Sequence, residues 1–115
     1  MNQVVLVGRL AEDPVVSKTE NGKNYTSINL AVPRAFKNSD GVYETDFIRC
    51  VLWNGVAANT SEYCHVGDVI GIKGRLQNRS YETENKEKKY ITEVIAERVT
   101  FISTNRKEIE DIKEK

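Results

Sequence analysis

The sequence carries no net charge and few of the residues from which metal centres and nucleophilic active sites are built. It has 17 basic and 17 acidic residues, so the field of the whole protein will not attract phosphates and any basic site must be local. The single histidine directly follows Cys64, and adjacent residues seldom face each other as nucleophile and base. No CxxC, HExxH or glycine-rich phosphate loop is present. We therefore expect a protein without enzymatic activity, metal or cofactor.

Long apolar runs are also lacking. No segment approaches the roughly 20 apolar residues that span a bilayer, and an alternating segment begins directly after residues 1–3. We therefore expect neither a membrane helix nor a signal peptide. The two cysteines, Cys50 and Cys64, lie in different expected elements, which favours reduced structural thiols in the cytoplasm.

Alternating apolar residues and turn signals predict five strands. They cover residues 3–10, 25–32, 47–53, 68–80 and 90–102, with a short helix over residues 56–63. Pro33 lacks the donor for strand pairing, so we expect a loop over residues 34–41. The charged stretch 82–89 is expected at the tip of a long hairpin between the last two strands. Gly71 and Gly74 predict a bend or bulge of the kind that closes barrels.

This order of elements predicts an all-β fold. We expect a five-stranded OB-fold barrel with a short helix between its third and fourth strands. The barrel is expected to occupy residues 1–104 as a single domain, followed by a short polar C-terminal tail over residues 105–115. Such barrels frequently bind single strands, but the fold does not by itself establish a function.

The stretch 47–53 has two unlike faces when it is placed on a strand. Its even-numbered residues are apolar enough for a core: Ile48, Cys50 and Leu52. Its odd-numbered residues place a guanidinium between two large rings: Phe47, Arg49, Val51 and Trp53. Rings offer stacking surfaces to unpaired bases and a cation between them suits phosphates, so this face is a candidate platform for single-stranded nucleic acid. The alternative is a strand buried on both faces, with Arg49 in an ion pair.

The fourth strand repeats this two-faced design. One of its faces carries cationic, amide and aromatic side chains: Lys73, Arg75, Gln77, Arg79 and Tyr81. An ion pair within the fold is the alternative role for Arg75. In the loop expected after Pro33, Phe36 stands between Arg34 and Lys37 and is an exposed aromatic unless something covers it. The other aromatics are expected to be packing residues: Tyr25, Tyr43, Tyr63, Tyr90 and Phe101.

Four segments together resemble the bacterial-type single-stranded DNA-binding proteins. They are NQVVLVGRL (2–10) with Asp13-Pro14, NLAV (29–32), TDFIRCVLW (45–53), and residues 67–81 with Thr92-Glu93-Val94. One piece alone would be a weak signal, whereas the set is specific because it spans about residues 2–102 in order. The resemblance implies a cytoplasmic, nucleoid-associated protein that binds and protects single-stranded DNA during replication, recombination and repair.

The resemblance also implies which residues bind. Bases in such proteins stack on aromatics of the third strand and its neighbouring loops or hairpins, which by position are Phe36, Phe47, Trp53 and Tyr81. Phosphates would pair with the basic residues Arg34, Lys37, Arg49, Lys73, Arg75 and Arg79. The family often has tryptophan at three of the aromatic positions, so weaker stacking is expected here. A homotetramer is implied as well, and apolar Val5 and Val7 on the outer face of the first strand are consistent with it.

The C-terminal residues depart from the pattern of the resembled family. Cellular members usually carry a Gly/Gln/Pro-rich tail with an acidic tip that recruits replication and repair proteins, and residues 110–115 do not match it. The resemblance therefore does not carry over recruitment of such partners, and a tail-less or truncated form would fit.

The competing function is a dimeric primosome-type accessory protein that binds single strands and docks replication proteins. Four copies in the assembly would support the first function, and two the second.

Overall fold

The computed structural model describes residues 1–104; the expected tail over residues 105–115 lies outside the described residues. The elements along the chain are β1 (Val4–Leu10), β2 (Ser17–Lys18), β3 (Asn24–Lys37), β4 (Tyr43–Trp53), α1 (Asn54–Tyr63), β5 (Val69–Glu82) and β6 (Lys88–Ser103). Within residues 1–104, no helix is long and apolar enough to cross a membrane.

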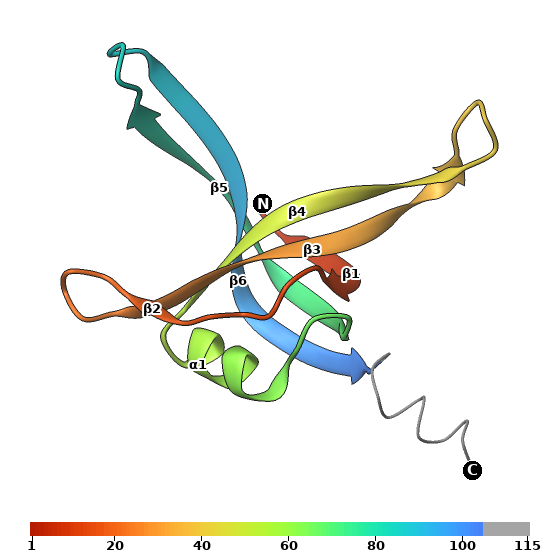
Figure 1. The fold of residues 1–115 in the computed structure, drawn as a ribbon, viewed down its shortest axis with the longest axis horizontal. Helices are drawn as coiled ribbons and strands as arrows, with labels where there is room; N and C mark the ends of the chain where they lie inside the picture. Colours follow the sequence, from red (N-terminus) through yellow and green to blue (C-terminus); the bar gives the residue numbers. More distant parts are fainter. Residues whose placement is uncertain (105–115) are drawn as a thin grey trace.

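The strands close into a barrel (Figure 1). They follow the order β1-β5-β6-β4-β3, and β1 returns to β3 through the pairs Arg9–Ala31 and Leu10–Leu30. The β4–β6 pairing is parallel, whereas the other pairings are antiparallel. The short strand β2 adds to β3 outside the closed ring, and α1 connects β4 to β5. The predicted OB-fold barrel, with its helix between the third and fourth barrel strands, is confirmed.

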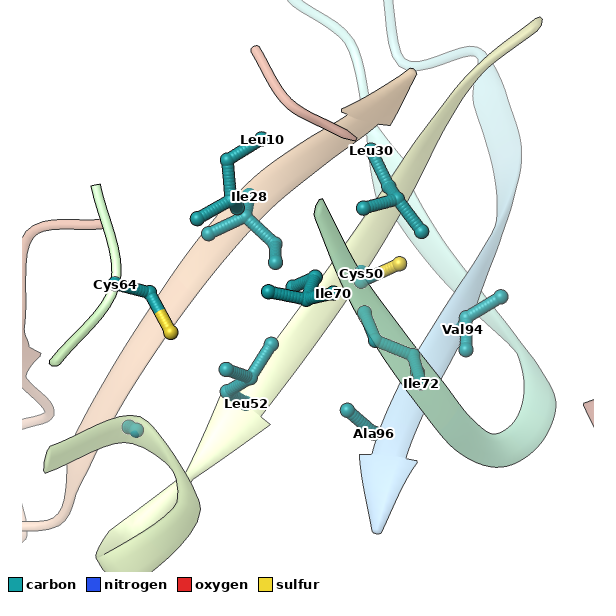
Figure 2. Packing of buried hydrophobic residues seen from close by; sticks show 11 residues of the cluster. Leu10, Ile28, Leu30, Cys50, Leu52, Cys64, Ile70, Ile72, Val94 and Ala96 are labelled. Carbon is teal, nitrogen blue, oxygen red and sulfur yellow. The ribbon is translucent and has the colours of Figure 1, made fainter. Parts of the chain in front are cut away.

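The core consists of the inward-facing residues of all five barrel strands, and Figure 2 shows how they meet. As predicted, Cys50 and Leu52 are fully buried, and Ile48 packs against them. They contact residues from the other barrel strands: Leu10, Ile28, Leu30, Ile70, Ile72, Val94 and Ala96. Both cysteines are buried, with Cys50 on β4 and Cys64 just after α1, and no disulfide forms within residues 1–104.

A predicted bulge lies where β5 bends past β6. Lys73 is opposite Arg98 but Gly74 is opposite Ala96, so β6 carries one extra residue at this point. A Cβ on Gly74 would lie 2.1 Å from the carbonyl oxygen of Ile95, which explains why this position needs glycine. Gly71 has ordinary contact space for a Cβ, so it is not required in the same way.

The prediction of a loop over residues 34–41 is wrong. Strand β3 continues to Lys37, with Pro33 opposite Thr45 and Lys37 opposite Tyr43, and only residues 38–42 form the connection. β1 pairs with β3 no further than Ala31, so one edge of β3 is unpaired at Pro33. Edge positions are where proline is tolerated in a sheet, and the strand therefore passes through it.

Two hairpins extend from the barrel as arms (Figure 1). We call residues 33–46 the β3–β4 arm and residues 80–90 the β5–β6 arm. Four of the five aromatics expected to pack are instead exposed: Tyr43, Tyr63, Tyr90 and Phe101. Tyr43 and Tyr90 lie on the arms, where the strands have outrun the barrel core, and α1 buries Ala57 and Thr60 rather than its last residue, Tyr63.

Candidate nucleic-acid interface

The outward face of β4 presents the predicted platform to solvent. Phe47 is 66% exposed, the Arg49 side chain is 42% exposed, and Trp53 is partly buried. Val51 between them is buried at 6% exposure. The alternative of a strand buried on both faces is therefore excluded, although Val51 itself is buried. The ion pair that this alternative gave to Arg49 is nevertheless present.

A groove crosses this face of the barrel. It has a volume of about 350 Å³, and residues from β3, β4, β5 and β6 line it together with Thr19: Tyr25, Ser27, Arg49, Val51, Trp53, Gln77, Arg79, Glu93 and Ile95. The register explains the assembly, because Ser27 pairs with Val51, Val51 with Ile95, and Ile95 with Arg75, so side chains from four strands share one face. The groove combines aromatic, aliphatic and cationic surface.

Glu93 lies at the centre of the cationic part of the groove. Its side chain is only 4% exposed, and its two oxygens accept hydrogen bonds from two arginines. Arg49 Nε donates to Oε2 at 3.0 Å and Arg79 Nε donates to Oε1 at 3.3 Å. A buried carboxylate is tolerated when it is paired and hydrogen-bonded, and these two contacts provide that. The three residues together carry a net charge of +1.

The aromatic part of the groove is a pair of rings. Tyr25 of β3 is directly opposite Trp53 of β4, and their ring centroids are 5.5 Å apart. The expectation that Tyr25 is a packing residue holds in part, since it packs against Trp53, but it also lines the groove. Sequence reasoning missed both Tyr25 and Glu93 as groove residues. Tyr25 could have been identified from its position on the same strand face as Ser27. The sequence offered no comparable indication for Glu93 beyond its position in Thr92-Glu93-Val94.

Arg34 is held by acidic residues across the β3–β4 arm. Its Nη1 donates to Glu44 at 2.6 Å, and its Nε and Nη2 donate to the two oxygens of Asp46 at 3.1 and 3.0 Å. The hydrogen bonds and charge of Arg34 lower the pKa of the Asp46 carboxyl, and Asp46 in turn raises the pKa of Arg34. Both partners are about half exposed, so the cluster lies in solvent. Arg34 is therefore partly neutralised where it stands.

The remaining predicted residues are spread around the groove rather than gathered in it. Phe36 is 82% exposed on the β3–β4 arm, where Lys37 Nζ lies 5.6 Å from the ring centroid of Tyr43. Tyr81 is 49% exposed on the β5–β6 arm. Arg75 donates to Gln77 Oε1 at 2.6 Å, so its predicted alternative role in an ion pair is replaced by a neutral hydrogen bond. Lys73 is opposite Val5 of β1 and does not line the groove.

A second hollow and an exposed apolar face adjoin the platform on the β1 side. The hollow has a volume of about 330 Å³, and Ala31 in its lining is directly opposite Phe47. On β1, Val5 is 73% exposed and Val7 is 53% exposed. Val7 also lines this hollow, which therefore lies between the apolar face of β1 and the position on β3 that pairs with Phe47.

Comparison with known proteins agrees with this geometry. The Single-strand binding protein family matches residues 1–102. Single-stranded DNA-binding protein B of Bacillus subtilis (strain 168) is 45% identical over 107 residues, which cover 93% of this chain and 95% of that protein. Single-stranded DNA-binding protein of Bacillus cereus is 47% identical over 102 residues, 89% of this chain and 60% of that protein. Single-stranded DNA-binding protein A of Bacillus subtilis is 44% identical over 102 residues, again 89% of this chain but 59% of the relative. The chain thus spans nearly all of the first relative and about three fifths of the other two.

Proposed function

The chain belongs to the Single-strand binding protein family, and we propose that it binds and protects single-stranded DNA, without regard to sequence, during replication, recombination and repair. The observation that carries this proposal is the groove across β3, β4, β5 and β6, in which the rings of Tyr25 and Trp53 lie beside the guanidiniums of Arg49 and Arg79. The same proposal places the protein in the cytoplasm, at single-stranded regions of the nucleoid.

Binding requires no chemical step. Bases stack on exposed rings, at roughly 1–3 kcal/mol for each base, and any base can do so because every base has a π-face. We propose Trp53 and Phe47 as the stacking residues of the barrel and Phe36 and Tyr81 as those of the arms, in keeping with their exposure. A duplex hides its base faces, so this surface selects single strands.

Phosphates are proposed to bind the basic side chains near these rings. The set is Arg34, Lys37, Arg49, Lys73, Arg75 and Arg79. Their contributions are expected to differ, because Arg49 and Arg79 face the groove whereas Arg34 is held by Glu44 and Asp46. Each phosphate contact releases counterions, so affinity should fall as salt rises.

The protein is further proposed to act as a homotetramer. The exposed Val5 and Val7 on β1 support an apolar contact between copies, since such a face is rarely left to solvent. Several barrels on one strand would bind it more tightly than one, through effective concentration. The mass of the assembly in solution tests this point, because two copies instead of four would favour the primosome-type accessory function.

The experiment for the binding function is a titration of Trp53 fluorescence with a long oligothymidylate at low and high salt. Trp53 is the only tryptophan, so the signal reports on the groove alone. We expect strong quenching that saturates at a fixed number of nucleotides per protomer and weakens with salt. A duplex of the same length is the control and should leave the emission nearly unchanged. Equal quenching by the duplex, or none by either in the folded protein, would contradict the proposal.

A further inference from the structure

Glu93 occupies an unexpected place for a negative charge. It lies on β6, between β4 and β5 in the barrel, in the part of the groove proposed to bind phosphates. Its carboxylate is almost fully buried, and it holds one arginine from each neighbouring strand at 3.0 and 3.3 Å. Considered as a charge alone, Glu93 should repel the DNA backbone and weaken binding.

The way in which Glu93 holds the arginines leaves their phosphate-binding atoms available. Arg49 and Arg79 each contact Glu93 through Nε. Within residues 1–104, the structure gives the Nη1 and Nη2 atoms of these two arginines no hydrogen bond to another protein group. Both side chains are nearly half exposed, and guanidinium Nη groups are well suited to bidentate contact with a phosphate.

We propose that Glu93 is a positioning residue, which fixes Arg49 and Arg79 as a single clamp on the sugar–phosphate backbone of the bound strand. The inference rests on the proposed function and deepens it. An unheld arginine loses much rotamer freedom when it binds a phosphate, whereas these two have lost it already in the free protein. Because both guanidiniums are tied to one carboxylate, they lie close together although their strands are not adjacent in the sheet.

The variant Glu93→Gln separates positioning from charge, because the two accounts predict opposite signs. Removing the carboxylate changes the net charge of the three residues from +1 to +2, so a charge effect alone would tighten binding and steepen its salt dependence. Loss of positioning should instead weaken binding to oligothymidylate by roughly tenfold, the scale on which loss of an orienting partner acts at metal sites. The matched control is Glu44→Gln, which removes a carboxylate from an exposed arginine and should tighten binding.

Double-mutant cycles with the two arginines show whether Glu93→Gln weakens DNA binding through Arg49 and Arg79 rather than through a change in the fold. In the wild-type background, Arg49→Gln and Arg79→Gln should each weaken binding clearly. In the Glu93→Gln background the same substitutions should cost less than about twofold, because the clamp is already broken. An unchanged cost in both backgrounds, or tighter binding by Glu93→Gln, would overturn the inference and leave the proposed function intact.

A second cycle does not depend on the stability of Glu93→Gln. Arg49→Lys and Arg79→Lys keep both charges, and for a clamp the double variant should bind hardly more weakly than either single variant. Additive losses would show two independent cations and overturn the inference. Thermal unfolding of each variant is measured in parallel, so that affinity is compared only between folded proteins. If the wild-type protein itself failed to bind oligothymidylate, the proposed function and the clamp would both fall.

Discussion

The rings of Tyr25 and Trp53 meet across the β3–β4 ladder, with centroids 5.5 Å apart and planes tilted by 38°. Tilted pairs at this separation are favourable for aromatic side chains. The tyrosine therefore supports the tryptophan from one side and fixes its orientation at the edge of the groove. A base that stacks on Trp53 meets a ring that is already held in place.

The first prediction concerns this support. Tyr25→Leu should weaken binding to oligothymidylate by about fivefold, or roughly 1 kcal/mol, because Trp53 loses its ring partner and the groove loses an aromatic surface. Titration of Trp53 fluorescence measures it directly. Tyr63→Leu is the control, since Tyr63 is exposed at the end of α1 and outside the groove. Equal affinities for the two variants would contradict the role given to Tyr25.

The second prediction concerns Arg34. Replacing both of its acidic partners, with Glu44→Gln and Asp46→Asn, should tighten binding at low salt and make the slope of log K against log salt more negative by about 0.7, the value for one added contact to a single strand. Glu62→Gln with Glu97→Gln removes the same charge from exposed positions outside the groove and should leave the slope unchanged.

The same cluster sets a pH expectation for the wild-type protein. Arg34 lowers the pKa of Asp46 below its usual 3.8, so Asp46 stays ionised and holds Arg34 at any pH above about 4. The stability that this pair contributes is present above pH 3.8 and is lost only as pH falls through the lowered pKa. Release of Arg34 should therefore make no contribution to DNA affinity between pH 8 and pH 5, which titrations of the wild-type protein and the double variant at both pH values can check.

The third prediction concerns the bulge. Gly74→Ala places a Cβ 2.1 Å from the carbonyl oxygen of Ile95, so the β5–β6 ladder must separate, and we expect a loss of about 3 kcal/mol or more in the free energy of unfolding. Gly55→Ala is the control, because a Cβ there meets no atom within 4 Å. Gly55 lies in α1, so alanine should be neutral or stabilising by up to about 1 kcal/mol. Urea unfolding measures both, and similar midpoints would contradict the explanation.

The fourth prediction concerns Cys50. Burial raises the pKa of its thiol from 9.0 to about 11, so between these values the unfolded chain releases a proton that the folded chain keeps. The stability from the buried thiol is complete below pH 9 and is lost as pH rises toward 11. The difference in free energy of unfolding between wild type and Cys50→Ala should therefore be smaller at pH 10.5 than at pH 8. A difference that does not change with pH would contradict the burial effect.

The parts of the fold that depend on short-range pattern could be predicted from the sequence. The alternation through residues 47–53 correctly predicted that Cys50 and Leu52 face the core and that Phe47 and Arg49 face outward, because a strand has a period of two whatever it pairs with. The bulge at Gly74 was likewise predicted from a local feature, a glycine within a strand. Together with the order of the strands and the helix, these features were enough to predict a closed barrel with an outward aromatic face.

Features that depend on pairing over long distances could not be predicted in this way. Arg49 and Glu93 are 44 residues apart and meet only because β4 and β6 pair in parallel, which no local pattern indicates. The extension of β3 through Pro33 depends on an edge that is free only because β1 ends its pairing at Ala31. The exposure of Tyr43 and Tyr90 likewise depends on where the barrel core stops and the arms begin.

The barrel is closed by the last strand of the domain, and this has a consequence for synthesis on the ribosome. β6 supplies Val94 and Ala96 to the core and is the strand that joins β4 to β5. A nascent chain can form the β3–β4 hairpin early, because its contacts are local, but it cannot complete its core until β6 has emerged. The groove also cannot form before β6 has emerged, because Glu93 lies on that strand. A growing chain therefore becomes able to hold DNA only when the domain is nearly finished.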